Sequence, residues 1–176
     1  MLLKPLWIYA LIMFTVGSNK VPSTGKEKIQ WLTLEEAQVK MQNDPKPVII
    51  DLYTKWCYWC KVMDKKTYTN QKVINYINQN FYPVKLDAEA RKTIQWEDKD
   101  FKFNPDMNVN DISLYLTNGQ LSFPTTIIYT SVNEAPANIP GFMAPDEIEP
   151  FLKYFGEQKY KKQTFQDFLK GFRKTW

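Results

Sequence analysis

The hydrophobic pattern of the chain changes character several times. Residues 47–53, Pro-Val-Ile-Ile-Asp-Leu-Tyr, form an apolar run interrupted by one acid. Such runs are typical of strands that are buried on both faces of a parallel or mixed sheet. Residues 81–87 and 123–129 have a similar character, and a weaker strand is expected over 137–140. The pattern therefore predicts a central sheet.

Helical patterns alternate with these strands. Thr33-Leu34-Glu35-Glu36 is a capping box, in which Thr33 and Glu36 can each satisfy an exposed amide, and its helix is expected to run to about residue 43. Further helices are expected from Cys57 to about Lys66, after Asn70 and from Pro145. This alternation predicts an α/β fold with a central mixed sheet flanked by helices.

The region after the second strand departs from this plan. Residues 88–120 contain two short apolar stretches around Glu97-Asp98-Lys99, which predict a small hairpin, and then a short helix ended by Asn118-Gly119. We interpret this region as an insert. A last amphipathic helix is expected over 164–172. The domain would span 31–176, preceded by a flexible lead-in over the polar residues 19–30.

The N-terminus has the pattern of an export signal. Lys4 precedes an uncharged run over 6–16, which two small residues follow. These are the three regions of a secretory signal peptide, so we expect residues 1–18 to be cleaved after Ser18. The run is shorter than the about 20 apolar residues of a membrane-spanning helix, and an uncleaved membrane anchor is the alternative. The mature protein would then be periplasmic or secreted, where disulfides form.

Composition excludes several classes of function. The 23 basic and 19 acidic residues give a net charge of +4, and the basic residues are dispersed, so a nucleic-acid groove is not expected. The chain has no histidine, which rules out Ser-His-Asp and Cys-His catalysis and histidine metal sites. Zinc would need ligands from carboxylates or from another chain, because only two cysteines are present. We expect no metal and no organic cofactor.

Those two cysteines, Cys57 and Cys60, stand in the stretch Trp-Cys-Tyr-Trp-Cys-Lys. A helix beginning at Cys57 would place both sulfurs on its first turn, where one thiolate can attack a foreign disulfide and the other can release the product. The alternative is a passive disulfide, but so small a loop removes little chain entropy and would stabilise the fold little.

The order of these motifs resembles the thioredoxin superfamily from about Val48 to about Phe155. The resemblance rests on the strand that leads into the Cys-x-x-Cys helix, on Tyr-Pro-Val-Lys-Leu-Asp over 82–87, on Ser-Phe-Pro-Thr over 122–125, and on the segment from Gly141. More narrowly, the Trp-Cys-x-Trp-Cys motif and the long insert look like secreted thioredoxin-like proteins of Bacteroidetes-type bacteria. The resemblance implies a thioredoxin-like fold and thiol-disulfide oxidoreductase activity.

Physical roles follow for the residues around the cysteines. At a helix N-terminus, free amides and the helix dipole favour a thiolate, so Cys57 would be the nucleophile and Cys60, expected to be more buried, would resolve the mixed disulfide. Asp51 would be costly to bury, and the resemblance implies that it relays a proton to the resolving cysteine, paired with Lys85. The alternatives are a strand-end acid that reaches solvent and an ordinary exposed lysine.

Five further residues are predicted to bind substrate. The resemblance implies that Pro124 is a cis-proline beside the sulfurs, so that Phe123 presents its backbone to a substrate strand; a trans proline is the alternative. Trp56, Tyr58 and Trp59 are expected to form a partly exposed apolar rim, with core packing as the alternative for Trp56. The Tyr-Trp pair between the cysteines contains no histidine or positive charge, which favours a reducing or isomerising role over strong oxidation.

The sequence thus predicts a monomeric extracytoplasmic thiol-disulfide oxidoreductase. Its partners would be disulfide-containing secreted proteins and a membrane or periplasmic electron donor. Two other hypotheses stay open. One is a thioredoxin-like binding module in which the rim, the insert and the last helix hold a partner. The other is a thiol peroxidase dependent on Cys57.

Overall fold

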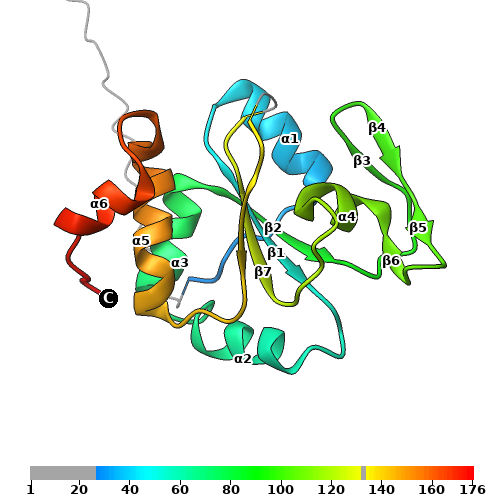
Figure 1. The fold of residues 1–176 in the computed structure, drawn as a ribbon, viewed down its shortest axis with the longest axis horizontal. Coiled ribbons are helices and arrows are strands. Elements are labelled where there is room, and N and C mark those ends of the chain that lie inside the picture. Colours follow the sequence, from blue (N-terminus) through cyan, green and yellow to red (C-terminus); the bar gives the residue numbers. More distant parts are fainter. Residues whose placement is uncertain (1–26, 132–133) are drawn as a thin grey trace, which may run out of the picture.

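The computed structural model describes residues 27–131 and 134–176 (Figure 1). The signal peptide predicted over residues 1–18 lies outside these ranges, as does most of the predicted lead-in. Helices and strands follow one another in the order that the hydrophobic pattern predicts. The elements are α1 (Leu34–Asn43), β1 (Val48–Tyr53), α2 (Tyr58–Lys66), α3 (Gln71–Asn80), β2 (Tyr82–Asp87), β3 (Ile94–Trp96), β4 (Lys99–Phe101), β5 (Phe103–Asn104), β6 (Val109–Asn110), α4 (Asp111–Thr117), β7 (Thr125–Tyr129), β8 (Ala137–Pro140), α5 (Pro145–Gly156), the short 3₁₀ helix η1 (Lys159–Lys161) and α6 (Phe165–Gly171).

The central sheet has the strand order β2-β1-β7-β8. Strands β1 and β2 are parallel, since α2 and α3 carry the chain back between them, whereas β7 is antiparallel to both β1 and β8. β1 therefore has neighbours on both edges and helices on both faces, which explains its continuous apolar sequence. The predicted mixed α/β sheet of a thioredoxin-like fold is confirmed.

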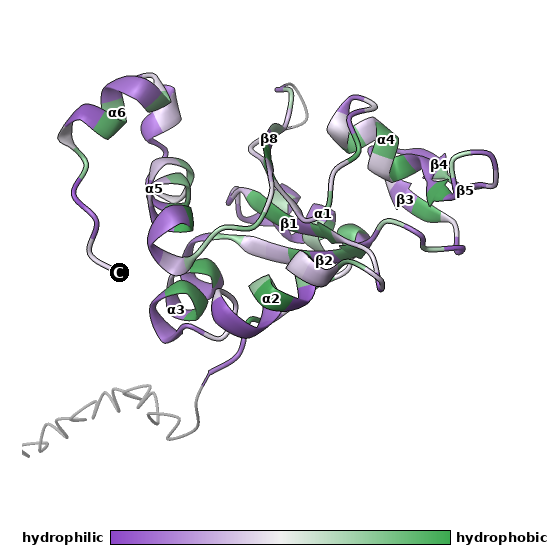
Figure 2. Cartoon of the chain, turned by 60° about the horizontal axis from the view of Figure 1, so that its bottom comes forward, coloured by the Kyte–Doolittle hydropathy of each residue, from purple (hydrophilic) through white to green (hydrophobic). Residues whose placement is uncertain are grey.

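Each face of the sheet has its own hydrophobic core. Ile50 and Leu52 of β1 pack with residues of α1 and α4, whereas Ile49 packs with residues of α2, α3 and α5. Figure 2 shows the mixture of apolar and polar residues along these helices that is typical of amphipathic segments. Because side chains alternate along a strand, Asp51 points to the same face as Ile49, the face that α2 covers.

The predicted insert, residues 88–120, contains two small hairpins and α4. The expected hairpin is β3-β4, and its turn residues Glu97 and Asp98 have left-handed backbones with φ of 50° and 59°. Trp96 from this hairpin is fully buried in the core on the α1 side, so the hairpin is packed onto the domain. Helix α4 ends at Asn118, whose φ is 51°, as expected from Asn118-Gly119. The second hairpin, β5-β6, was not predicted.

Residues 28–30 belong to the packed part of the molecule, although they fall within the stretch predicted as a flexible lead-in. The Ile29 side chain is buried in the core on the α2 side. The Asn78 side chain on α3 accepts a hydrogen bond from the Gln30 amide and donates one to the Lys28 carbonyl, at 3.0 and 2.9 Å. The segment that follows forms an isolated parallel bridge between Leu32 and Val84. Residues 28–30 are therefore held against α3.

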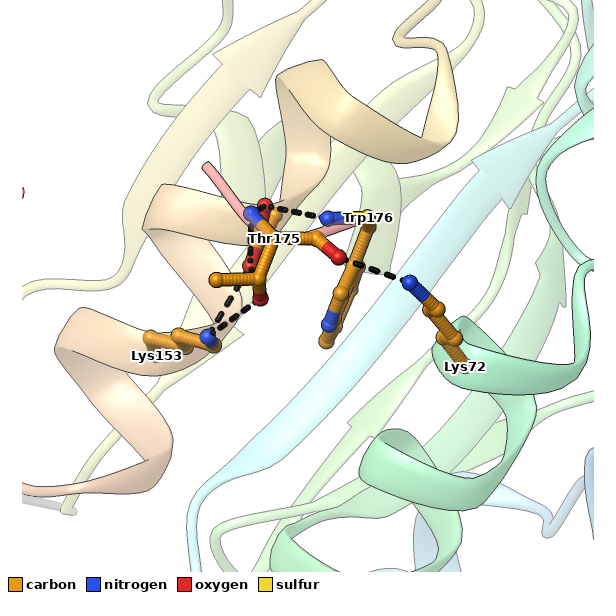
Figure 3. A network of polar contacts seen from close by, with 5 residues as sticks. Lys72, Lys153, Thr175 and Trp176 are labelled. Carbon is orange, nitrogen blue, oxygen red and sulfur yellow. Dashed lines mark hydrogen bonds and ion pairs between the residues drawn. The ribbon is translucent and has the colours of Figure 1, made fainter. Parts of the chain in front are cut away.

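The C-terminal residues fold back against α5 and α3 (Figure 3). Glu149 on α5 has a fully buried side chain, which pairs with Lys153 at 2.9 Å. The Glu149 carboxylate also accepts hydrogen bonds from the backbone amides of Thr175 and Trp176, at 2.8 and 3.2 Å. Lys72 on α3 donates to the Thr175 carbonyl at 2.7 Å. This network satisfies a buried carboxylate and attaches the C-terminal segment to the domain.

The helix predicted over 164–172 is present as α6, with Thr164 as its N-cap. It packs on α5 through aromatic rings: Phe165 stacks on Phe151 with centroids 4.6 Å apart, and Phe168 lies 5.5 Å from Tyr154. Across 27–131 and 134–176, no helix is both long enough and apolar enough to cross a membrane.

Candidate functional site

The two cysteines lie at the start of α2 and form a disulfide, with an S–S distance of 2.10 Å and Cα atoms 5.4 Å apart. Cys57 is the N-cap residue, and its Sγ accepts a hydrogen bond from the Cys60 amide at 3.0 Å. The Cys57 amide in turn donates to the Thr54 carbonyl at 3.2 Å, which closes the turn after β1. Both sulfurs therefore lie on the first turn of the helix, as the spacing predicts.

The start of α2 favours negative charge on the first sulfur. The helix dipole and the free amides of the first turn stabilise an anion at the N-cap, and no acidic residue in that turn opposes them. Cys57 and Cys60 are almost equally buried, with 4% and 3% of their surfaces exposed. Cys60 is therefore the more buried of the two by only a small margin in the disulfide form.

Asp51 lies in the middle of β1, and only 2% of its surface is exposed. Its Oδ2 atom pairs with Lys85 Nζ on the neighbouring strand β2 at 2.8 Å. Lys85 also pairs with Asp64 on α2, which lies one helical turn after Cys60. A single ammonium group thus connects the strand carboxylate to the helix that carries the cysteines.

Burial is the main cause of an elevated pKa at Asp51, and the nearby Lys85 opposes that shift without cancelling it. The Asp51 Oδ1 atom is buried and has no hydrogen-bond partner among the described residues, so the ionised carboxyl is incompletely compensated. Burial lowers the pKa of Lys85, but the two carboxylates outweigh this effect and raise it overall. Lys85 therefore stays charged at neutral pH, whereas burial disfavours the ionised form of Asp51.

A row of polar side chains extends across the sheet on this face. Lys85, Asp51 and Thr126 are register partners on β2, β1 and β7. The Thr126 hydroxyl is also buried without a partner in the described part of the chain, and so is the hydroxyl of Tyr68. Burial and the Asp51 charge raise the pKa of Tyr68 well above its ordinary value, which keeps this phenol neutral. A neutral hydroxyl can donate to an ionised carboxylate or accept from a protonated one.

Three aromatic rings surround the Lys85 ammonium. Its Nζ atom lies 4.9 Å from the ring centroid of Tyr53, 5.3 Å from that of Trp31 and 5.7 Å from that of Tyr68. Each ring face attracts a cation, so the rings help to hold the charge of a partly desolvated lysine. A surface hollow of about 440 Å³ opens beside this group and is lined partly by Trp31, Asp64 and Tyr68.

Three residues of this polar group were not predicted from the sequence: Asp64, Tyr68 and Thr126. Asp64 follows Cys60 by four residues, a spacing that places both on one face of a helix. That spacing could have identified it. Thr126 could have been found from the strand register. Tyr68 lies in the connection after α2, where no periodic pattern indicates which way a side chain points.

Large exposed aromatic side chains surround the disulfide. Trp56, Tyr58 and Trp59 have 66%, 69% and 53% of their surfaces exposed. The Trp56 ring meets Phe123 edge to face at a centroid distance of 5.9 Å, and Trp59 lies 5.6 Å from Phe142. Core packing of Trp56, the alternative weighed above, is therefore wrong. We call Trp56, Tyr58, Trp59 and Phe123 the aromatic rim.

A shallow hollow of about 300 Å³ lies within this rim, lined by Trp59, Phe123, Pro124, Gly141 and Phe142. The Phe123–Pro124 peptide bond is cis, as expected, so the trans alternative is wrong. The Pro124 carbonyl accepts a hydrogen bond from the Gly141 amide at 2.8 Å, which fixes this wall of the hollow. The site therefore combines two buried cysteines with an exposed apolar surface beside them.

Within residues 27–131 and 134–176, no group of three or more His, Cys, Asp or Glu side chains is placed to hold a metal ion. Asp51 and Asp64 are both held in ion pairs with Lys85.

Comparison with known proteins places this geometry in a family. Residues 15–176 match the family Thioredox_DsbH, which is described as "Protein of unknown function, DUF255". The solved structure titled "DsbH Oxidoreductase" has a TM-score of 0.55 with this structure at 17% sequence identity, and the superposition covers 80% of this chain and 94% of that one. At this level of identity, the likeness shows a shared fold.

Two relatives align with parts of the sequence. "Uncharacterized protein B0495.5" of Caenorhabditis elegans is 32% identical over 83 residues, which are 45% of this chain and 11% of that protein. "Thiol:disulfide interchange protein DsbD" of Campylobacter jejuni strain RM1221 is 23% identical over 114 residues, which are 65% of this chain and 17% of that protein. The aligned segments thus span less than a fifth of either relative.

The family match covers nearly all of the chain, including every element that builds the site. The strand order, the cysteine pair at the start of α2 and the cis-proline beside it agree with the predicted superfamily. The chain therefore belongs to the Thioredox_DsbH (DUF255) family, and its fold is that of the thioredoxin superfamily.

Proposed function

We propose that this protein is an extracytoplasmic thiol-disulfide oxidoreductase that reduces or exchanges disulfides in secreted proteins. The observation that carries the proposal is the redox-capable pair Cys57–Cys60 at a helix N-terminus, recessed within an exposed aromatic rim. The names of the relatives DsbD and DsbH support the same class of reaction. The N-terminal sequence pattern supports export.

The first step is attack by the reduced protein on a substrate disulfide. The Cys57 thiolate forms a bond to one substrate sulfur, and the other substrate sulfur leaves as a thiolate that takes up a proton. A mixed disulfide between Cys57 and the substrate results. The helix N-terminus supports this step because it raises the fraction of Cys57 that is ionised at neutral pH.

The second step resolves the mixed disulfide. The Cys60 thiol gives its proton to the Asp51 carboxylate, and the resulting thiolate attacks Cys57 Sγ. This attack breaks the bond between Cys57 and the substrate, and the second substrate sulfur leaves as a thiolate that takes up a proton. The substrate has gained two electrons and the protein ends as the Cys57–Cys60 disulfide. Lys85 stays charged and holds the Asp51 carboxylate in place. Asp51 suits this task because burial raises its pKa toward neutrality.

The rim supplies the binding surface for substrate in this proposal. Trp56, Tyr58 and Trp59 offer exposed apolar area around the sulfurs, and the backbone of Phe123 and Pro124 lines the hollow beside them. An extended polypeptide segment can lie in such a hollow with its disulfide above Cys57. The pair between the cysteines, Tyr58-Trp59, brings no positive charge, which favours a reducing or isomerising direction.

A reductase needs a supply of electrons. A protein partner, such as a thiol protein of the membrane or the periplasm, would return Cys57–Cys60 to the dithiol form by the same exchange chemistry. No metal or organic cofactor takes part in the proposed cycle, and the working unit is a monomer.

The test is reduction of insulin by the reduced protein under continuous supply of dithiothreitol, with Cys57→Ser as control. We expect turnover that depends on Cys57, and covalent capture of envelope proteins by the Cys60→Ser variant. Equal rates for wild type and Cys57→Ser would overturn the enzyme proposal. That outcome would favour the rival hypothesis of a binding module, for which the exposed rim is the supporting observation.

A further inference from the structure

A single carboxylate oxygen connects the aromatic rim to the insert. Glu89, just after β2, accepts a hydrogen bond from the Trp56 indole at 3.1 Å through its Oε1 atom. The same Oε1 atom accepts a second hydrogen bond from the side-chain amide of Asn108, also at 3.1 Å. Asn108 lies in the turn between β5 and β6. Residues 56, 89 and 108 are thereby brought together from three separate segments.

The turn that carries Asn108 is built rigidly. The side chain of Asn104 accepts hydrogen bonds from the amides of Asp106 and Met107, both at 3.1 Å. Asn110 is fully buried, and its side-chain amide donates to the carbonyls of Ala90 and Lys92 at 3.0 Å each. In Figure 1 the β5-β6 hairpin lies on the side of the sheet where β1 ends and the chain leads toward α2. The turn is therefore held in a defined place near the rim.

The turn also exposes an apolar side chain. Met107 has 52% of its surface exposed, although it lies directly beside Asn108. Methionine is flexible and polarisable, and it suits surfaces that accept varied apolar partners. Met107 is thus an exposed apolar residue next to Asn108, which Glu89 links to Trp56, the residue immediately before Cys57.

We propose that the β5-β6 turn is a recognition arm for protein substrates, with Glu89 as the positioning residue that couples it to Trp56. The occupant of the arm is the polypeptide segment on one side of the substrate disulfide, because the turn that carries Met107 is joined through Glu89 to Trp56, the residue next to Cys57. A small disulfide ends before that point and gains nothing from the arm. This inference rests on the proposed function and names the class of substrate that the site selects.

Variants of the arm should slow the reaction with protein disulfides and leave the reaction with small disulfides unchanged. Truncating a central contact of a binding surface costs at least about 1 kcal/mol, which is about fivefold in a rate that depends on binding. Asn108→Ala removes the link to Glu89 while leaving the Trp56–Glu89 hydrogen bond, and Met107→Ser removes the apolar contact. Glu89→Gln retains an acceptor oxygen and should restore most of the selectivity that Glu89→Ala loses.

The experiment uses the reduced full-length chain in a Cys60→Ser background and measures single-turnover formation of the mixed disulfide at Cys57. Insulin is the protein probe and dithiobis(nitrobenzoic acid) the small one. We expect the ratio of the insulin rate to the small-disulfide rate to fall about fivefold in Met107→Ser and Asn108→Ala. The matched control is Val39→Ser, which changes a residue of similar exposure, 56%, on α1. Its ratio should stay within about twofold of the parent protein.

The proposed arm would be wrong if Met107→Ser and Asn108→Ala left the ratio of the insulin rate to the small-disulfide rate as unchanged as Val39→Ser does. A parallel fall of both rates would also overturn the arm, since that result indicates a damaged thiol site. A parent protein that does not react with insulin would overturn it as well. The proposed function is tested separately by turnover of the wild type, so the arm can fail while turnover persists. The reverse outcome, selective trapping without turnover, would sustain the arm and overturn the catalytic cycle.

Discussion

At the scale of single residues, Asp51 is the clearest case of a residue that is costly to the fold and useful to the site. Its position inside an apolar run already indicates a special task, because an acid there loses its hydration. The structure adds the surroundings: Lys85 at 2.8 Å, a second carboxylate on the same lysine, and one oxygen without a partner in the described residues. Such incomplete compensation keeps the pKa of Asp51 raised.

The pH dependence of resolution follows from that pKa. Asp51 accepts a proton only when ionised, so the resolving rate should fall as the pH falls through its raised pKa. We expect Asp51→Asn to slow resolution about a hundredfold and to abolish this acid limb. The measurement is the pH profile of mixed-disulfide resolution by stopped flow. Asp98→Asn, in the exposed β3-β4 turn, is the control, and an acid limb that survives in Asp51→Asn would exclude this residue as the base.

The stability of the fold should depend on pH in the opposite direction to the resolving rate. Because the folded state raises the pKa of Asp51, protonated Asp51 favours folding. This contribution is fully present below the unfolded pKa, about 3.9, and is lost as the pH rises through the folded value. The ionised base that resolution requires is therefore also the form that the fold tolerates least.

At the scale of elements, helix ends were predicted well because their chemistry is local. The α1 capping box has Thr33 accepting from the Glu36 amide at 3.2 Å and Glu36 accepting from the Thr33 amide at 2.8 Å. The cap of α2 uses the same geometry with a sulfur in place of the hydroxyl. The second insert hairpin was missed, since strands of two residues carry no alternation that a sequence pattern could reveal.

The α1 cap gives a prediction at this scale. Thr33→Ala leaves the Glu36 amide without its partner and should lower the free energy of unfolding by about 1 kcal/mol. Thr33→Ser keeps the hydroxyl and should lose far less. Urea denaturation of the two variants and the wild type measures the difference in the free energy of unfolding, and the slope of that free energy against urea concentration should be equal among them. If both variants lose the same amount, the methyl group of Thr33 matters and the capping bond does not.

At the scale of the whole molecule, Glu149 decides how the C-terminal segment is attached. Burial raises the pKa of Glu149, but the hydrogen bonds from Thr175 and Trp176 and the pair with Lys153 outweigh burial and lower it overall. A lowered pKa means that the ionised form stabilises the fold above the unfolded pKa, about 4.3. That stability is lost as the pH falls through the folded value.

We expect Glu149→Gln to lower the free energy of unfolding at neutral pH by about 2 kcal/mol, because charge-assisted hydrogen bonds to a buried carboxylate are lost. The loss should shrink as the pH falls below the unfolded pKa of about 4.3 toward the lowered pKa of the folded carboxyl. Thermal unfolding of both proteins between neutral and acidic pH measures it. Glu157→Gln, which removes an exposed pair with Lys159, should change stability by less than about 1 kcal/mol. A difference at Glu149 that does not vary with pH would contradict this account.

The sequence by itself determined the elements of the central sheet, the helices beside them, their order and the reactive pair. Apolar runs, caps and the Cys-x-x-Cys spacing are local properties, so they can be recognised from the sequence alone. Asp51 stands out because it is an acid within an apolar run. From Val48 to Phe155 this was enough to predict the superfamily and the positions of Cys57 and Cys60.

Only the tertiary structure decided which side chains meet. Asp64 reaches Lys85 across the α2–sheet interface, the Glu89 oxygen gathers Trp56 and Asn108, and Glu149 holds residues 175 and 176. These contacts join residues far apart in the chain, and no periodicity connects them. Their geometry depends on strand register, helix packing and the path of the insert. These are fixed only when the hydrophobic cores on the two faces of the sheet are packed.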